Sequence, residues 1–181
     1  EHDAAGVPIA RRVLGGDPAL FERYVALLLD AVVPPMRDFG VALEAHGQNT
    51  LARFRDGVLV GFAIRDFGGV RLHRPTLAAA GHELDLAPGS APDAPDLETV
   101  WAKLHHCVVQ HQLGELIRAL DLGEAGWAVV RRHVDRLLLG TPAHAFWTAP
   151  TVPHKCLLRM RLEGLYRDYV YRPGPNPLSG G

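Results

Sequence analysis

Apolar residues recur at helical spacing in the first part of the chain. Asp17 is a typical N-cap residue, and Pro18 suits the first position of a helix. The apolar positions that follow would share one helix face: Leu20, Phe21, Tyr24, Val25, Leu28 and Val32. The pattern predicts a helix that breaks or kinks at Pro34-Pro35 and stops at Gly40.

A β-hairpin is predicted next, after a short apolar stretch at 41–46. Residues 49–54 and 58–67 are both rich in side chains that are typical of strands. Between them lies the turn Arg55-Asp56-Gly57, and Asp-Gly between two such runs is a strong hairpin signal.

The second half of the chain predicts two longer helices. A Pro/Ala-rich loop at about 84–95 precedes the first helix, which is capped by Asp96. Its inward-facing positions are Leu97, Trp101, Leu104, Val108, Leu116 and Leu120. The second helix runs from about Glu124 to Leu139 and carries an apolar stripe of Trp127, Val130, Val134 and Leu137.

The C-terminal region is less clearly patterned. Residues 155–165 fit a strand or a helix, and the Pro/Gly-rich tail at 172–181 is expected to be irregular. No internal repeat or second domain boundary is visible. The sequence therefore predicts an α+β fold in a single domain, 1–181, with a small antiparallel β-hairpin or sheet unit packed against a mostly helical region.

Composition narrows the functional classes. Of the 181 residues, 48% are hydrophobic and 22% charged, which is typical of a globular protein, and the net charge of −1 gives no electrostatic case for binding nucleic acid or an anionic membrane. No apolar run is long enough for a transmembrane helix, and the first residues do not resemble a signal peptide. The two cysteines predict no disulfide framework, so we expect a cytoplasmic location.

Polar side chains crowd both ends of the predicted hairpin. Antiparallel strands place the start of the first strand beside the end of the second. Six polar groups are therefore expected to converge: Glu44, His46, Gln48, Asn49, Arg65 and Asp66. A polar turn whose groups cap one another is the structural alternative, but six converging groups favour a binding site.

The chemistry of these groups suits a metal–phosphate site. Carboxylates and a side-chain amide are ligands for Mg²⁺, which bridges phosphate oxygens. His46 and Arg65 can donate hydrogen bonds to a phosphate or a carboxylate. Gly47 and the Gly68-Gly69 pair allow the backbone to approach a ligand closely.

Protein kinases use a similar layout, in which an Asn and a later Asp both hold Mg²⁺. The chain even contains Asp-Phe-Gly at 66–68. However, no catalytic-loop Asp precedes Asn49, and no glycine-rich phosphate loop or strand lysine comes before it. A kinase-like phosphotransferase therefore remains an alternative.

A closer resemblance covers most of the chain. The stretches "GVALEAHGQNTLARF" and "RDFGGVRL" resemble the signature of the NRPS-independent siderophore synthetases of the IucA/IucC type, including the region often grouped with FhuF-like proteins. The likeness extends upstream to "LLLDAVVPPMRDFG" and downstream to "VPHKCLLRMRLEG" and "NPL".

This resemblance implies an ATP-dependent ligase. Such an enzyme adenylates citrate or a related polycarboxylate and passes the acyl group to an amine or a hydroxyl. By position, the Mg²⁺ ligands would be Glu44, Asp66 and Asn49, and the ATP contacts His46, Gln48, Asn49 and Arg65. His46 is then the candidate catalytic residue. Lys155 is either a contact for the polycarboxylate or a solvent-facing lysine.

Family members are much longer, and their other nucleotide-binding residues precede this motif. We therefore expect the chain to be the C-terminal portion of a synthetase, inactive alone, and to self-associate through exposed apolar surface. A non-catalytic module that binds a ligand or a partner is a further alternative.

Cysteine and histidine positions point away from other metal chemistry. FhuF-type ferric reductases carry a Cys-rich iron–sulfur motif near the C-terminus, where this chain has only Cys156, so iron reduction is disfavoured. His105, His106 and His111 lack the spacing of three or four residues that a metal site on an α-helix needs. These histidines, with Cys107, are interpreted as core or surface residues.

Overall fold

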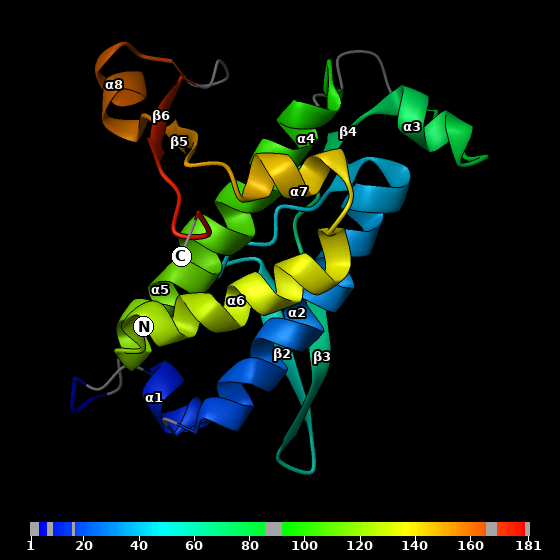
Figure 1. Ribbon diagram of the computed structural model, residues 1–181. Coiled ribbons are helices and arrows are strands. Elements are labelled where there is room, and N and C mark those ends of the chain that lie inside the picture. The colour runs from blue at the N-terminus through cyan, green and yellow to red at the C-terminus, as the bar shows by residue number, and fades with distance from the viewer. Residues whose placement is uncertain (1–3, 7–8, 16, 86–91, 166–169, 180–181) are drawn as a thin grey trace.

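Helices and small antiparallel sheets make up the chain (Figure 1). The computed structural model describes residues 4–6, 9–15, 17–85, 92–165 and 170–179. Within these ranges the strands form three two-stranded sheets, β1 with β4, β2 with β3, and β5 with β6. The predicted α+β class is confirmed.

The long helix α2 spans Pro18–Phe39 and follows the short α1, Ile9–Leu14. Its predicted ends are confirmed, because Asp17 Oδ1 accepts from the Ala19 N–H at 2.9 Å and Gly40 adopts a left-handed conformation with φ 67°. Of the two predicted outcomes at the prolines, a break is wrong, since the helix continues through both, and a kink stays a prediction. The side chains around them are fully buried, and this packing outweighs the lost backbone hydrogen bonds.

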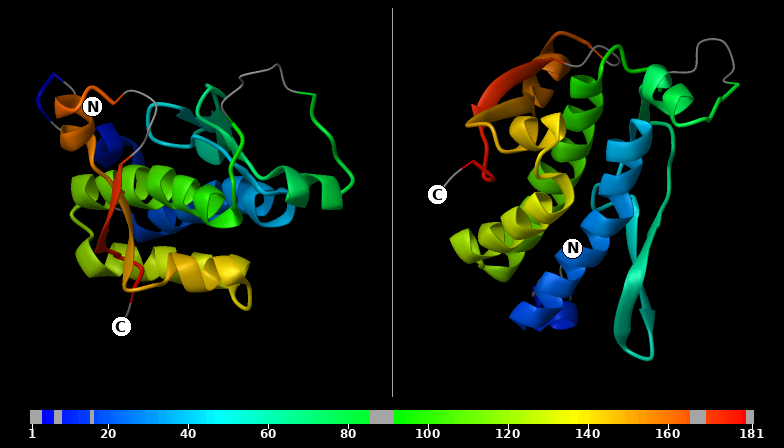
Figure 2. Two further views of the ribbon diagram at one scale, coloured as in Figure 1. Left: turned by 90° about the horizontal axis from the view of Figure 1, so that it is seen from above. Right: turned by 45° about the vertical axis from the view of Figure 1, so that its right-hand side comes forward.

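The hairpin is confirmed as β2, Thr50–Arg55, and β3, Val58–Ile64. Asp56 and Gly57 both have positive φ, 49° and 77°, which is the geometry of the favoured two-residue turn. Strand β3 lies along α2 (Figure 2), and Arg23 Nε donates to the Leu59 carbonyl at 2.8 Å across this contact. The hairpin is therefore held to the body through β3.

A second, unpredicted pairing closes the base of the hairpin. Strand β1, Val41–Ala42, pairs antiparallel with β4, Arg71–Leu72. This pairing holds together the segments that enter and leave the hairpin. Beyond β4 lie α3, Arg74–Ala79, and the predicted loop at 84–95, of which residues 86–91 lie outside the described residues.

The first predicted helix of the second half is made of three parts. Helix α4, Leu97–Leu104, begins at Asp96, whose Oδ1 accepts from the Thr99 N–H at 2.7 Å as predicted. The chain then forms a π-helix, η1, over His105–Leu113 before α5, Gly114–Leu120. Sequence periodicity did not indicate the π-helix. The π-helix changes which side chains of this segment lie on the same face.

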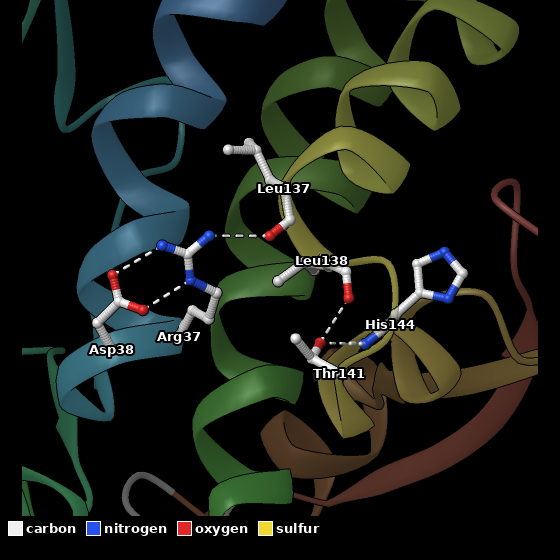
Figure 3. A network of polar contacts seen from close by, with 6 residues as sticks. All are labelled: Arg37, Asp38, Leu137, Leu138, Thr141 and His144. Carbon is white, nitrogen blue, oxygen red and sulfur yellow. Dashed lines mark hydrogen bonds and ion pairs between the residues drawn. The ribbon is translucent and has the colours of Figure 1, made fainter.

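Helices α6, Gly123–Leu138, and α7, Pro142–Trp147, complete the helical layer. The bounds of α6 agree with the prediction to one residue. Polar contacts fasten its C-terminal end (Figure 3). Arg37 of α2 donates to the Leu137 carbonyl at 3.0 Å, and Thr141 Oγ1 donates to the Leu138 carbonyl at 2.7 Å while accepting from the His144 N–H.

The C-terminal region is more ordered than predicted. The ambiguous stretch contains the end of a strand, β5, Thr151–Lys155, followed by a helix, α8, Leu157–Leu162. The tail is not irregular throughout, because β6, Tyr171–Pro175, pairs antiparallel with β5. A proline is tolerated in a strand at a sheet edge, and a two-stranded sheet consists only of edges.

One apolar core joins α2, α4, η1, α5, α6 and α7, and its largest fully buried side chains include Trp147, Leu28, Leu29 and Met36. Other apolar side chains are exposed on α8 and the hairpin, among them Leu158, Leu162, Leu51 and Phe54. The predicted self-association stays a prediction. No helix in the described ranges is both long and apolar enough to cross a membrane.

Truncating a core leucine should cost far more stability than truncating a surface one. Leu28 is fully buried on α2, whereas Leu139 is 73% exposed. We expect Leu28→Ala to lower the free energy of unfolding by about 2–5 kcal/mol, because it leaves a cavity. Leu139→Ala should change it by less than about 0.5 kcal/mol. Urea unfolding measures both, and equal losses would contradict this assignment of the core.

Candidate active site

The open end of the hairpin brings together part of the predicted polar cluster. The Arg65 N–H donates to the Asn49 carbonyl at 2.9 Å, and Arg65 Nε donates to the Gln48 carbonyl at 3.1 Å. The residues before β2 and after β3 therefore lie side by side, as antiparallel pairing predicts.

Residues 44–49 form a tight turn, and hydrogen bonds within the turn fix the orientation of the Asn49 and His46 side chains. The N–H groups of Asn49 and Thr50 both donate to the His46 carbonyl, at 2.9 and 3.1 Å. Asn49 is buried, and its Nδ2 donates to the Glu44 carbonyl at 3.2 Å. The same Nδ2 lies 3.4 Å from His46 Nε2. An amide nitrogen can only donate, so His46 Nε2 is an acceptor and its Nδ1 carries the proton.

Asp66 turns back on the loop that follows β3. It has a left-handed backbone with φ 64°, and its Oδ1 accepts from the Gly68 N–H at 3.0 Å. Aspartate tolerates this conformation better than most residues do. The Asp66 side chain is exposed, so the rest of its carboxylate can receive a ligand.

The sequence predicted Glu44 as a ligand for a metal ion, but in the structure its carboxylate forms an ion pair. Its Oε1 lies 2.6 Å from Lys103 Nζ on α4, and both side chains are largely buried. The carboxylate also packs on the backbone of Gly69, where an added Cβ would lie closer to Glu44 Oε2 than any non-bonded contact allows. Gly69 is therefore needed for close packing against Glu44, whereas the close approach to a ligand expected from the sequence stays a prediction.

Lys155 lies in the same electrostatic environment. Burial lowers the pKa of its amine, and the charge of Lys103 lowers it further, while Glu44 opposes this effect. Arg71 also contributes a lowering effect. Lys155 belongs to β5, which contacts η1. The structure thus places a lysine from the C-terminal sheet near the Glu44–Lys103 pair.

The π-helix adds residues that the sequence reasoning set aside. The His106 and His111 rings meet edge to face with centroids 4.5 Å apart. A π-helix repeats its hydrogen bonds every five residues, so side chains five positions apart share a face. Burial lowers the pKa of His111, and the nearby His46 lowers it further. The assumed α-helical repeat was wrong for this segment, but within the described ranges no metal-holding group includes these histidines, which agrees with their interpretation as core or surface residues.

Lys103 was also missed. The available signal was a single lysine inside the apolar pattern of the predicted helix, where a charged side chain requires a partner. Within the described ranges, no three His, Cys, Asp or Glu side chains are placed to hold a metal ion by themselves. A Mg²⁺ ion at Asp66, Glu44 and Asn49 would therefore need phosphate oxygens, which is how Mg²⁺ is commonly held in nucleotide sites.

Comparison with known proteins places the chain in a family. Residues 18–170 match the family described as ferric iron reductase FhuF-like transporter. The chain therefore belongs to this FhuF-like family.

Among curated proteins, the chain is 48% identical to the NRPS-independent siderophore synthetase rfs of Rhizopus delemar, over 87% of this chain and 26% of the relative. It is 32% identical to the D-ornithine–citrate ligase of Staphylococcus aureus, over 87% of this chain and 28% of the relative. The chain thus spans about a quarter of the length of these relatives. The predicted resemblance to siderophore synthetases is confirmed.

The fold has a close structural counterpart. The petrobactin biosynthesis protein AsbB from Bacillus anthracis superposes with a TM-score of 0.74 at 23% identity. The match covers 98% of this chain and 34% of that protein. At this level of identity the comparison establishes a shared fold.

Placing a side chain at position 69 should break the Glu44–Lys103 ion pair. In Gly69→Ala, the new Cβ forces the Glu44 carboxylate to swing away from Lys103. We expect a loss of about 1–2 kcal/mol in the free energy of unfolding, the range for a hydrogen bond to a charged group. Gly47→Ala is the matched control, because nothing lies within 4 Å of its added Cβ.

The same measurement in a Lys103→Met background tests the cause of this loss. With the ion pair already absent, Gly69→Ala should cost clearly less, since the two changes remove one interaction. An unchanged cost in that background would contradict the role assigned to Gly69.

Stability should fall with decreasing pH partly because of His105. This residue is 1% exposed, and burial lowers its pKa from 6.5 to about 3. Between these values the unfolded chain holds a proton that the folded chain lacks. The group therefore removes up to about 1.4 kcal/mol of stability per pH unit as the pH falls from about 6.5 toward 3.

The variant His105→Phe keeps a ring against Trp147, which His105 contacts edge to face at 5.4 Å, but it cannot titrate. Urea unfolding of both proteins between pH 4.5 and 7 measures the effect. The wild-type protein should lose more stability than the variant toward low pH. Parallel curves would show that His105 does not contribute.

Proposed function

We propose that this chain forms part of the active site of an ATP- and Mg²⁺-dependent ligase of siderophore biosynthesis. The observation that carries the proposal is the 48% identity to a siderophore synthetase over 87% of the chain. The relatives named as citrate ligases support a citrate-type carboxylate and an amine as the two substrates to be joined.

The hairpin end suits the nucleotide. Arg65 uses its Nε for the Gln48 carbonyl, which fixes the guanidinium and leaves its terminal nitrogens to meet a phosphate. Both hydrogen bonds found on the Asn49 side chain use Nδ2, so its Oδ1 is the atom suited to a cation. Asp66, which directly follows Arg65, supplies an exposed carboxylate at the same end of the hairpin.

A Mg²⁺ ion would be held here by Asp66 and Asn49, with Glu44 completing the set only if its ion pair with Lys103 loosens. When bound, the ion would neutralise the charge that develops on the phosphates. His46, with its proton on Nδ1, is placed to donate a hydrogen bond to the nucleotide.

The lysines suit the carboxylate substrate. The charge of Lys103 lowers the pKa of Lys155, and a bound polycarboxylate would relieve this repulsion. We assign Lys155 as a substrate contact on this ground. Lys103 is paired with Glu44 and therefore acts mainly by holding that carboxylate in place.

The reaction proceeds in two displacements. A substrate carboxylate oxygen attacks the α-phosphorus, a C–O–P linkage forms, and pyrophosphate leaves. The amine nitrogen or hydroxyl oxygen of the second substrate then attacks the acyl carbon, AMP leaves with the bonding electron pair, and a proton is released. The residues of this chain contribute by holding both substrates in line and by stabilising phosphate charge.

The relatives are roughly four times longer than this chain. We therefore assign the complete activity to a longer protein, in which this chain forms one side of the active site. We infer that the chain alone does not turn over. We also place the reaction in the cytoplasm, where ATP is available.

Replacing Asp66 should abolish adenylation in the complete reading frame that encodes this chain. We expect Asp66→Asn to lower the formation of AMP and pyrophosphate from ATP and citrate by about 100-fold or more, since it removes a charge that the proposed Mg²⁺ site needs. Asp56→Asn is the matched control, because Asp56 is the other hairpin-end aspartate with positive φ, 49°, and lies in the turn between β2 and β3. Asparagine tolerates the same backbone conformation at both positions.

The identity of the nucleotide product separates this proposal from its alternative. A ligase of this type produces AMP and pyrophosphate, whereas a phosphotransferase produces ADP. ADP as the citrate-dependent product would overturn the proposal. Equal loss in the Asp56→Asn control would remove Asp66 from the site.

A further inference from the structure

Gln110 of the π-helix forms hydrogen bonds within η1 and to strand β5 of the C-terminal sheet, and we call this set of contacts the Gln110 clamp. Gln110 Nε2 donates to the Pro153 carbonyl of β5 at 3.1 Å. A carbonyl oxygen only accepts, so this contact fixes which end of the Gln110 amide is nitrogen. The same nitrogen lies 3.3 Å from His105 Nδ1. The opposite end of the amide is thereby committed as an acceptor.

This orientation sets the tautomer of His106. Its Nδ1 lies 2.9 Å from Gln110 Oε1, and an amide oxygen can only accept, so His106 Nδ1 carries the proton. In a neutral imidazole the other nitrogen then carries a lone pair. Among the residues that the structure describes, His106 Nε2 makes no hydrogen bond of its own.

The surroundings keep this imidazole neutral. The pKa of His106 is lowered to about 4, mainly by burial and also by the charges of His111, Lys155 and Lys103, while the Gln110 hydrogen bond opposes this shift. The result is an uncharged hydrogen-bond acceptor that lies within the electrostatic influence of Lys155 and Lys103. Pro153, which anchors the clamp, is two residues from Lys155 in the same strand.

Few ligand groups suit a neutral imidazole acceptor, His106 Nε2, in a positively charged environment. A carboxylate is repelled by the imidazole lone pair but attracted by the lysines. A hydroxyl group can donate to the imidazole while neighbouring carboxylates contact the amines. The combination therefore matches a molecule that carries a hydroxyl next to its carboxylates.

We propose that His106 Nε2 accepts a hydrogen bond from the hydroxyl group of the polycarboxylate substrate, with Gln110 as the positioning residue that fixes its tautomer. This inference rests on the proposed function and deepens it, because it makes His106 the residue that selects hydroxy-polycarboxylates over analogues without the hydroxyl. The π-helix is essential to this arrangement of hydrogen bonds, since it brings His105 and Gln110, five positions apart, into contact.

Citrate and propane-1,2,3-tricarboxylate differ only in the hydroxyl and so provide the probes. Isothermal titration of this chain should show citrate binding about 3- to 10-fold more tightly, the range for one hydrogen bond. In His106→Leu the two affinities should come within about 2-fold of each other, through weaker citrate binding alone. His82→Leu, at an exposed histidine outside this cluster, should keep the wild-type ratio.

A measurement on the unaltered chain avoids dependence on a variant that fails to fold. Histidine ¹⁵N NMR at pH 7 should show His106 as the Nδ1–H tautomer, with its Nε2 resonance shifted by citrate and much less by the tricarboxylate. An Nε2–H tautomer, or equal shifts with both acids, would overturn the inference.

The outcomes also separate this inference from the proposed function. Equal binding of the two acids by the wild-type chain, or an unchanged ratio in His106→Leu, overturns the role of His106 and leaves the ligase proposal standing. No binding of either acid overturns both the role of His106 and the assignment of a polycarboxylate contact to this chain.

Discussion

The ion pair between Glu44 and Lys103 is the contact on which the arrangement of the site depends. It joins the turn that enters the hairpin to helix α4, whose continuation is the π-helix. Compared with a well-packed apolar pair, a largely buried ion pair adds little net stability because both charges lose their hydration, although breaking it is costly. The ion pair instead fixes the position of the Glu44 side chain. This side chain packs against the backbone of Gly69 and so holds the loop that follows β3 next to the 44–49 turn.

The π-helix is the second constraint. An α-helix would place His106 and His111 on different faces and would remove the contact between His105 and Gln110. The wider turn is maintained because Val108, Val109 and Leu113 are fully buried in the core. Packing energy thus supports a backbone geometry that brings polar side chains of the same segment to the site.

Local signals in the sequence predicted a large part of this structure. Asp17, Gly40, Asp96 and the Asp56-Gly57 turn each act through contacts with near neighbours in the chain, and each was found as predicted. The convergence of Gln48, Asn49 and Arg65 followed from antiparallel pairing alone.

Interactions between distant segments could not be predicted in the same way. The partner of Glu44 lies 59 residues away, and the pairing of β5 with β6 depends on a tail whose composition suggested no structure. The π-helix escaped detection because its apolar positions also fit an α-helix, and only tertiary packing decides between the two repeats.

The distribution of charge along the site follows from these contacts. Asp66 directly follows Arg65 at the hairpin end, whereas Lys103 lies on α4, His106 on η1 and Lys155 on β5 of the C-terminal sheet. Glu44 stands between the two regions and is neutralised by Lys103. If Glu44 were unpaired, its charge would repel a carboxylate approaching Lys155; the ion pair removes that repulsion while keeping the backbone around Asn49 in place. Under the proposed function, this segment would contact an anionic nucleotide and its metal on one side and an anionic acid on the other.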